Sequence, residues 1–300
     1  MELQRQTANN INTRSKKKKC IILIYVAILF AALAVWAFYI GLTVRTYGVT
    51  SDKMPQGSAV RIAVIADLHS HVYGKDQTPL LDIIKAQKPD IIALAGDIVD
   101  DHEPQTGAKL FLQDITDIAP TYYVSGNHEY WSGRCDEIKE MISGYGVKVL
   151  SNERQYISVN GARLCICGID DPEVFRYTDD NELLALSDYE DLLKRFSDLD
   201  ADTVNILLAH RPESIDAYRQ YYFDVVLSGH THGGQVRIPL LVNGVFAPNQ
   251  GWFPKYAGGH YELEGMNMIV SRGLGFDARQ PRVFNPPEVV VVDIKGDTSH

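Results

Sequence analysis

Short apolar runs recur along the chain after residue 58, and most of them end in a polar residue. The runs are rich in Val, Ile and Leu and are bounded by turn residues, which predicts buried strands. They occupy residues 60–66, 90–95, 122–124, 204–209 and 224–227. Segments with helical periodicity lie among them, at residues 78–87, 106–118, 135–145 and 181–198. This alternation indicates βα units and an α/β fold class.

The middle and the end of the chain predict further strands. Asn160-Gly161 separates two alternating runs, residues 155–159 and 162–167, and Asn-Gly suits the tight turn of a β-hairpin. Residues 261–263, 267–270 and 289–294 are expected to form strands of a second sheet. Residues 236–253, rich in Gly, Pro and aromatic side chains, are either a substrate-facing loop or a packed surface loop.

The N-terminal region contains an apolar run of a different length. Residues 21–44 are nearly free of polar groups, about 24 residues or roughly 36 Å of helix, which is enough to span a bilayer. The main alternative is a cleaved signal peptide, because Ala32-Leu33-Ala34 resembles a small-residue cleavage site. The run continues through Leu42, too far for a typical signal peptide, and this favours an uncleaved anchor.

Charge divides the chain in the same way. Residues 1–20 carry six cationic side chains and one carboxylate, a net charge of +5, so the rest carries −14 of the total −9. The positive-inside rule then predicts a basic cytoplasmic tail (1–20), a transmembrane anchor (21–44), a linker (45–57) and an extracytoplasmic domain (58–300) in the cell membrane. Residues 1–15 look disordered. An acidic domain has no nucleic-acid-binding surface evident, since such binding needs clustered Lys and Arg.

Cysteine use is sparse. Cys165 and Cys167 lie two apart on a predicted strand and therefore share a face without easily bridging each other. We expect all four cysteines to be reduced structural thiols.

The candidate chemistry lies at the ends of the predicted strands. Five polar clusters follow the apolar runs: Asp67-Leu68-His69, Gly96-Asp97, Gly126-Asn127-His128-Glu129, His210, and His230 with His232. Ligands at the carboxyl ends of several strands converge in space. The clusters supply carboxylates, imidazoles and an amide oxygen but no thiolate, which suits two divalent metal ions such as Mn, Fe or Zn.

The series of clusters resembles the calcineurin-like metallophosphoesterase superfamily. The longer stretch Ser228–Gln235 is similar to its bacterial membrane-anchored branch, together with Gly168–Asp171 and Ser271–Gly275. The resemblance covers roughly residues 58–294. It implies a four-layer α/β/β/α sandwich around a dimetal centre, here preceded by one N-terminal transmembrane helix.

The resemblance also implies a role for each residue. Asp67, His69 and His232 would hold one metal. Asn127, His210 and His230 would hold the other, and Asp97 would bridge the two. His128 would be the catalytic residue that approaches the phosphoester oxygen; the alternative role is support of Asn127 or another ligand.

The function expected from this resemblance is that of a membrane-anchored dimetal phosphohydrolase acting on a phosphoester. Two cations would clamp the phosphoryl oxygens and lower the pKa of a bound water, which makes a hydroxide available near neutral pH. The alternatives are a lipid-linked (nucleotide-diacylglucosamine-type) pyrophosphatase or phosphodiesterase, and a non-catalytic metal-binding scaffold. Asp170 is a candidate orienter of a ligand histidine, and Arg211, Arg272 and Arg282 are candidates for pairing with the substrate phosphate.

Overall fold

The computed structural model describes residues 2–176, 189–276 and 281–297, with side chains from residue 16 onward. The chain divides into two compact units, Met1–Tyr39 and Ile40–His300. The second unit contains every strand and all the predicted site residues.

The first unit is one helix, α1 (Glu2–Ala37). Its segment Lys16–Ala37 has a mean hydropathy of 2.8 and is long and apolar enough to cross a membrane, as either an anchor or a signal sequence. The helix differs from the expectation at both ends. It includes the residues expected to be disordered, and it stops at Ala37 rather than Val44, since Thr43 and Val44 already belong to strand β1.

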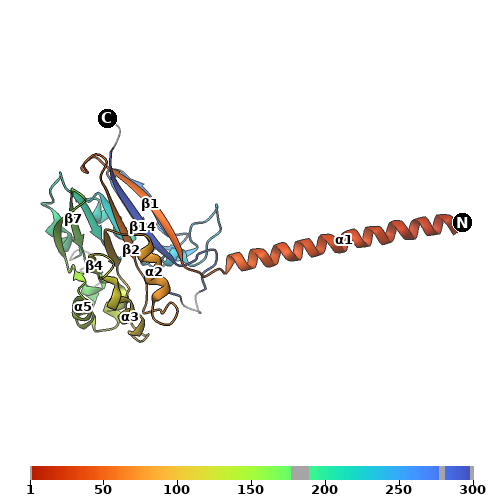
Figure 1. Cartoon of the computed structure of the whole chain (residues 1–300), viewed down its shortest axis with the longest axis horizontal. Coiled ribbons are helices and arrows are strands. Elements are labelled where there is room, and N and C mark those ends of the chain that lie inside the picture. Colours follow the sequence, from red (N-terminus) through yellow and green to blue (C-terminus); the bar gives the residue numbers. More distant parts are fainter. Residues whose placement is uncertain (1, 177–188, 277–280, 298–300) are drawn as a thin grey trace. The chain divides into compact units, whose positions relative to one another are not determined.

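The first sheet of the second unit has six strands and carries β1 at one edge (Figure 1). Its order is β1 (Thr43–Ser51), β14 (Glu288–Gly296), β2 (Ala59–Ile65), β3 (Ile91–Ala95), β4 (Thr121–Val124) and β5 (Lys148–Val149). Only the β14–β2 pair is antiparallel. The carboxyl ends of β2, β3 and β4 therefore lie at one edge of the sheet.

The second sheet also has six strands. Its order is β12 (Gly259–Leu263), β13 (Met266–Val270), β9 (Val225–Ser228), β8 (Val204–Leu208), β7 (Ala162–Gly168) and β6 (Glu153–Val159). The central strands are parallel and the two outer pairs are antiparallel. A two-stranded ribbon, β10 (Phe246–Ala247) with β11 (Gly251–Trp252), lies outside both sheets.

Hydrophobic contacts join the sheets and helices into a core. One buried cluster contains side chains of both sheets, including Ile62, Ala93, Ile206 and Leu227, so the sheets pack face to face. A second cluster joins the first sheet to α2 (Thr78–Ala86), α3 (Thr106–Ile115) and α5 (Cys135–Gly144), which gather beside it in Figure 1. A third cluster joins the second sheet to residues 189–223. The helices are α2 (Thr78–Ala86), α3 (Thr106–Ile115), α4 (Asn127–Trp131), α5 (Cys135–Gly144), α6 (Glu173–Arg176) and α8 (Ile215–Tyr218), with 3₁₀ turns at Lys194–Phe196, Pro212–Ser214 and His232–Gly234.

Most predicted elements are confirmed. The α/β class holds, with two mixed sheets, and the hairpin turn places both Asn160 (φ 50°) and Gly161 (φ 82°) in the left-handed region. All four cysteines are free thiols. The helix expected at residues 181–198 lies partly outside the described residues; from Tyr189 to Phe196 the described backbone is helical.

Two expectations about strands were wrong. The segment expected to be a linker, residues 45–57, is largely strand β1, which pairs in parallel with β14. Strand β14 belongs to the first sheet rather than the second. Both errors have one cause, because β1 and β14 pair across almost the whole chain and local patterning carries no information about such a distant partner.

Candidate metal centre

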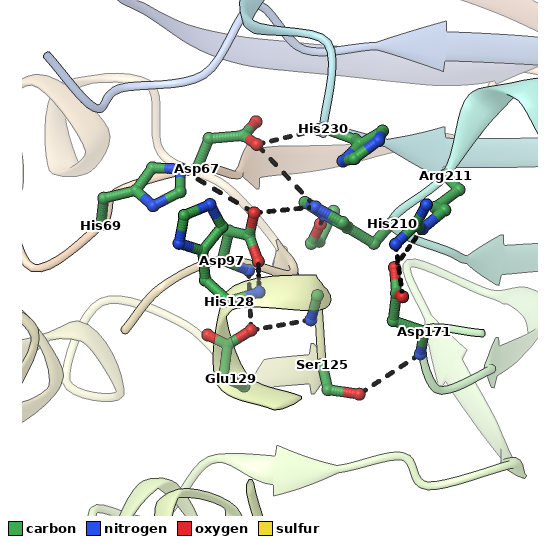
Figure 2. Close-up of polar contacts among 12 residues, drawn as sticks. Asp67, His69, Asp97, Ser125, His128, Glu129, Asp171, His210, Arg211 and His230 are labelled. Atoms are coloured by element: carbon green, nitrogen blue, oxygen red, sulfur yellow. Dashed lines mark hydrogen bonds and ion pairs between the residues drawn. The ribbon is translucent and has the colours of Figure 1, made fainter. Parts of the chain in front are cut away.

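The edge where the parallel strands end brings all the predicted site residues together. Asp67 follows β2, Asp97 follows β3, Asn127 begins α4 just after β4, His210 follows β8 and His230 follows β9. Figure 2 shows Asp97 at the middle of the group, with Asp67 and His69 on one side and His210 on the other. The site is therefore built from both sheets, on loops that a rigid scaffold positions.

The backbone at these strand ends is unusual. Five of the predicted ligands adopt a positive φ: Asp67 (51°), His69 (48°), Asp97 (52°), His230 (72°) and His232 (47°). Non-glycine residues rarely occupy this region, at a cost of roughly 1–3 kcal/mol each. Such strain persists only where the surrounding structure enforces it, and it concentrates at functional sites.

One group of ligand atoms contains Asp67, His69 and His232. An imidazole nitrogen or carboxylate oxygen of each residue lies within 4.8 Å of the other two. The Nε2 atoms of His69 and His232 are 3.2 Å apart, and Nε2 of His232 is 3.7 Å from Oδ1 of Asp67. A cation between these atoms would satisfy nitrogen lone pairs that otherwise face each other.

A second group contains Asp97, His210 and His230, again within 4.8 Å of one another. Oδ2 of Asp97 lies 3.0 Å from Nε2 of His210 and 3.8 Å from Nε2 of His69. Asp97 therefore stands between the two groups, where one carboxylate can reach both.

Unpartnered buried atoms show that the site fits cations. Among the described residues, Asp67 Oδ2, Asn127 Oδ1 and His210 Nε2 are fully buried and make no hydrogen bond. His210 Nε2 lies 3.0 Å from Asp97 Oδ2, which is an ion-pair distance when the imidazole is protonated. Leaving a buried polar atom unsatisfied costs about 1–3 kcal/mol. All three atoms are good ligands for divalent cations, which would remove that cost.

The far nitrogens of three histidines are held by hydrogen bonds. Nδ1 of His69 lies 3.0 Å from Asp100 Oδ2, Nδ1 of His210 donates to Ala95 O at 2.8 Å, and Nε2 of His230 lies 2.9 Å from Asn249 Oδ1. A histidine that donates one N–H to an oxygen presents the lone pair of the other nitrogen, as ligation requires. His232 differs, since its Nδ1 lies 3.4 Å from Nη2 of Arg282.

The electrostatics of the site follow from burial and from neighbouring charge. Burial and the nearby positive groups Arg211 and His69 hold the pKa values of His230 and His232 well below the usual range, so these imidazoles are neutral. Burial also opposes protonation of His210, but Asp97 and Asp67 outweigh it and raise that pKa to about 10. A cation bound at His210 must therefore displace a proton.

Backbone amides fix the two central carboxylates. His128 N donates to Asp97 Oδ1 at 2.9 Å, and His230 N donates to Asp67 Oδ1 at 2.8 Å. Behind them, the buried carboxylate of Glu129 accepts from Asp97 N, Gly126 N and Val99 N at 2.7–3.0 Å (Figure 2). Burial and then Asp97 raise the pKa of Glu129 to about 7. Glu129 thus positions the loop that carries Asp97.

Two glycines allow this close packing. A Cβ on Gly126 would lie 2.2 Å from Asp97 Oδ1, and one on Gly229 would lie 2.6 Å from Asp67 Oδ2. Any side chain at either position would displace a carboxylate.

His128 lies beside the first group of ligand atoms. Its ring is partly exposed, and Nδ1 lies 2.7 Å from Oδ1 of Asp101. The ring packs edge-on against His69, with centroids 4.3 Å apart. Because Asp101 holds Nδ1, Nε2 is the nitrogen that can approach a substrate oxygen.

The three arginines considered for phosphate binding are engaged elsewhere. Arg211 makes two hydrogen bonds to Asp171 and one to Glu173, and Arg272 pairs with Glu288. The buried Arg282 donates to two backbone carbonyls. Desolvated pairs of this kind are costly to separate, so these arginines stabilise the loops around the site.

Asp170 also differs from its expected role. It accepts from Ser125 Oγ at 2.7 Å and pairs with Lys139 at 2.8 Å, so its contacts support the fold behind α4. The residues that orient ligand histidines are Asp100 and Asn249. Sequence reasoning missed Asn249, because nothing in the irregular stretch around it distinguishes that residue. Asp101 is adjacent to Asp100, and only the structure assigns it to His128.

Comparisons with known proteins identify relatives of this chain. A model of the calcineurin-like phosphoesterase family matches residues 60–234. An uncharacterized metallophosphoesterase of Aquifex aeolicus is 30% identical over 279 residues, 91% of this chain and 98% of the relative. A transmembrane protein with metallophosphoesterase domain from Bos taurus is 28% identical over 260 residues, 82% of this chain and 55% of the relative. The solved structure of phosphopantetheinyl hydrolase (PptH) from Mycobacterium tuberculosis is a distant likeness, with 14% identity and a TM-score of 0.46 over 75% of this chain and 92% of its own.

The family match covers more than half of the chain, and it includes all the candidate ligands in the two groups described above. Members of the family typically bind two metals. The chain belongs to the calcineurin-like phosphoesterase family and is a metal-dependent phosphoesterase hydrolase.

Proposed function

We propose that this enzyme holds two divalent cations and uses them to hydrolyse a phosphoester at the outer surface of a membrane. The observation that carries the dimetal part is the pair of ligand groups that meet at Asp97, with buried ligand atoms lacking any other partner. Asp67, His69 and His232 would hold one cation, Asn127, His210 and His230 would hold the other, and Asp97 would be shared by the two. When bound, the cations neutralise phosphoryl charge and lower the pKa of a water molecule.

The direction from which substrate approaches follows from exposure. The side chains of Asp67 and His210 are fully buried, whereas those of His69, His232 and His128 are 12%, 19% and 24% exposed. The phosphoester therefore enters on the side of these three imidazoles. On this side His128 is the residue that we assign to proton donation to the leaving oxygen.

Asp101 supports this role of His128. Its carboxylate, 2.7 Å from Nδ1, accepts the N–H of that nitrogen and fixes the direction in which Nε2 points. Arg211 and Arg272 pair with internal carboxylates, and Arg282 donates to backbone carbonyls, so we infer that the charge of the substrate is met by the cations and His128 rather than by an arginine clamp.

Membrane anchoring is the second part of the proposal. Lys16–Ala37 is long and apolar enough to span a bilayer, and four lysines precede the apolar run. The positive-inside rule keeps that end in the cytoplasm and translocates the enzyme domain. The Bos taurus relative is described as a transmembrane protein, which is in keeping with an anchor.

A lipid-linked phosphoester is the second candidate substrate. Six large apolar side chains between residues 238 and 253 are exposed, on a loop joined to the metal centre. A hydrolase for purely soluble substrates has no need of such a surface.

The dimetal assignment is tested with Asp97→Asn. A neutral amide bridges two cations poorly, so we expect loss of at least one metal per chain and hydrolysis of an aryl phosphodiester reduced by about 10² or more. Asp198→Asn is the matched control, since this carboxylate is exposed and pairs with Arg154. Two metals per chain and near-normal turnover in Asp97→Asn would remove the bridging assignment.

The anchor and its orientation are tested by protease added to intact cells. Residues 38–42 separate α1 from β1, so cleavage there releases a domain that retains every strand. The full chain should be found in the membrane fraction and lose its C-terminal epitope to external protease. Protection of the epitope until lysis would overturn the orientation. A mature protein that already lacks residues 1–34 would show that the segment is a signal peptide.

A further inference from the structure

The loop that follows the ligand His232 exposes an unusual amount of apolar surface. We call residues 236–253 the apolar loop. Six of the twelve large hydrophobic side chains exposed on the described part of Ile40–His300 belong to it: Ile238 (46% exposed), Leu240 (105%), Leu241 (81%), Phe246 (45%), Trp252 (72%) and Phe253 (67%). Scattered apolar residues are ordinary on a protein surface, whereas a concentration on one segment marks an interaction site.

Backbone hydrogen bonds hold these side chains outward. Ile238 and Val242 exchange N–H···O bonds of 3.0 and 2.8 Å, which closes a tight turn with Leu240 and Leu241 at its tip. The rings of Phe246 and Trp252 pack across the β10–β11 ribbon, with centroids 5.5 Å apart. Leu240 also has a φ of 70°, a strained conformation for a leucine. The loop thus maintains both strain and apolar exposure, two costs that a binding partner can offset.

The apolar loop is attached directly to the metal centre. Val245 N donates to Gly234 O at 3.1 Å, in the turn that contains His232. Asn249 accepts from Nε2 of His230 and from Nη1 of Arg211, both at 2.9 Å. A surface that docks on the loop is therefore brought next to the site of hydrolysis.

The loop also lies at the end of the domain where β1 begins. Asn243 accepts from Arg272, Arg272 pairs with Glu288, and Glu288 is the register partner of Thr43, the first residue of β1. Only residues 38–42 separate Thr43 from the end of α1, a reach of roughly 20 Å when fully extended. If α1 spans a bilayer, this connection keeps the β1 end of the domain close to the lipid surface.

The charge of the chain around the apolar loop also favours a lipid surface as the partner. The sequence has no Asp or Glu between Asp224 and Glu262, although residues 21–300 carry a net charge of −14. The apolar loop itself contributes Arg237, and Lys255 follows shortly after it. A segment with cations, leucines and a tryptophan, and without carboxylates, matches the chemistry of the headgroup and upper acyl region of a phospholipid bilayer.

We propose that the apolar loop inserts into the interfacial region of the bilayer that holds α1, so that the metal centre takes a phosphoester presented at headgroup level. This inference rests on the membrane anchoring proposed above. The leucine tip and the Phe246–Trp252 pair enter the lipid, and Arg237 and Lys255 remain among the headgroups.

The chain carries its own probes for a test, since its three tryptophans are Trp36 in α1, Trp131 in α4 and Trp252 in the loop. Full-length single-tryptophan variants, made by Trp→Phe substitution of the other two, are reconstituted in phosphatidylcholine vesicles with or without brominated acyl chains. Bromine quenches only tryptophans that reach the acyl region. We expect Trp36 and Trp252 to lose about half of their emission or more, and Trp131 to keep nearly all of it.

The possible outcomes distinguish insertion of the apolar loop from anchoring by α1. Quenching of Trp36 with Trp252 behaving like Trp131 would overturn docking by the loop and leave the anchor intact. Absence of quenching at Trp36 would remove the anchor and this inference with it. Shielding of Trp252 from both bromolipid and aqueous iodide would show that a protein surface, such as a second copy of the chain, covers the loop instead.

A second variant tests the leucine tip. The pair Leu240→Ser and Leu241→Ser should reduce bromolipid quenching of Trp252 about two-fold or more, with hydrolysis of a soluble aryl phosphodiester unchanged. Tyr222→Ser, which removes an exposed ring outside the loop, is the matched control and should leave the quenching as it was. Unchanged quenching in the double variant would contradict insertion by the tip.

Discussion

Gly126→Ala is a small substitution that should disable the metal centre. Gly126 lies between β4 and α4 with φ −108° and ψ −170°. Any residue can adopt this conformation, so a side chain is excluded only by the lack of room for it. The new methyl would lie 2.2 Å from Asp97 Oδ1 and 2.7 Å from Asp97 N. Ordinary contact needs about 3.4 Å or more, and Asp97 must therefore move by roughly 1 Å.

The backbone cannot yield easily, because Glu129 ties Gly126 N, Asp97 N and Val99 N to one buried carboxylate. A misplacement of about 1 Å costs on the order of 10²-fold in rate, and overpacking costs about 1–3 kcal/mol of unfolding free energy. We expect Gly126→Ala to retain at most one metal per chain, with kcat/KM for an aryl phosphodiester lowered about 10²-fold.

Elemental analysis after dialysis, steady-state kinetics and urea unfolding measure the three quantities separately. Gly144→Ala is the matched control, since a Cβ there meets no atom within 4 Å at the end of α5. It should keep both metals and leave stability unchanged or raised by up to about 1 kcal/mol. Two metals and wild-type kcat/KM in Gly126→Ala would refute the claim that Asp97 must stay in place.

The remaining predictions concern His128 and Arg211. His128→Ala should lower kcat by about 10²–10⁴ with metal content intact, and by less for nitrophenolate leaving groups, which need little protonation; metal loss in proportion to activity would make the residue structural. Arg211→Met removes the guanidinium that pairs with the buried Asp171, so urea unfolding should show a loss of about 3–5 kcal/mol. The exposed Arg154–Asp198 pair gives the comparison, since Arg154→Ala should cost less than about 1 kcal/mol; equal losses would contradict the argument from burial.

The elements near the site could be predicted because each strand is specified by residues that are neighbours in the sequence. Strands β3, β4, β8 and β9 are buried along their whole length, β2 is buried from Ile62 to Ile65, and each is followed by turn residues. The position of a ligand at the end of a parallel strand is set by the position of that strand in the sheet. The strand pattern therefore predicts one shared site for Asp67, Asp97 and His210.

The hydrogen-bond partners of these residues could not be predicted in this way. Asn249 lies in an irregular stretch, and its contact with His230 depends on how the apolar loop folds back on the Gly234 turn. The charge of Arg211 suggested a substrate contact, yet burial beside Asp171 makes it an internal ion pair. A side chain's type gives the contacts it is able to make, and packing selects among them.

The sequence by itself determined the α/β class and the apolar N-terminal segment, because both depend on short-range periodicity. It indicated the candidate metal ligands through polar clusters at the ends of predicted strands and through a family resemblance. Only the tertiary structure decided that residues 43–51 form a strand beside β14, that Asp101 holds His128 and that the leucines of the apolar loop face outward. These features join residues far apart in the chain or depend on solvent exposure. Such contacts form only when the sheets and loops pack, and local propensity does not encode them.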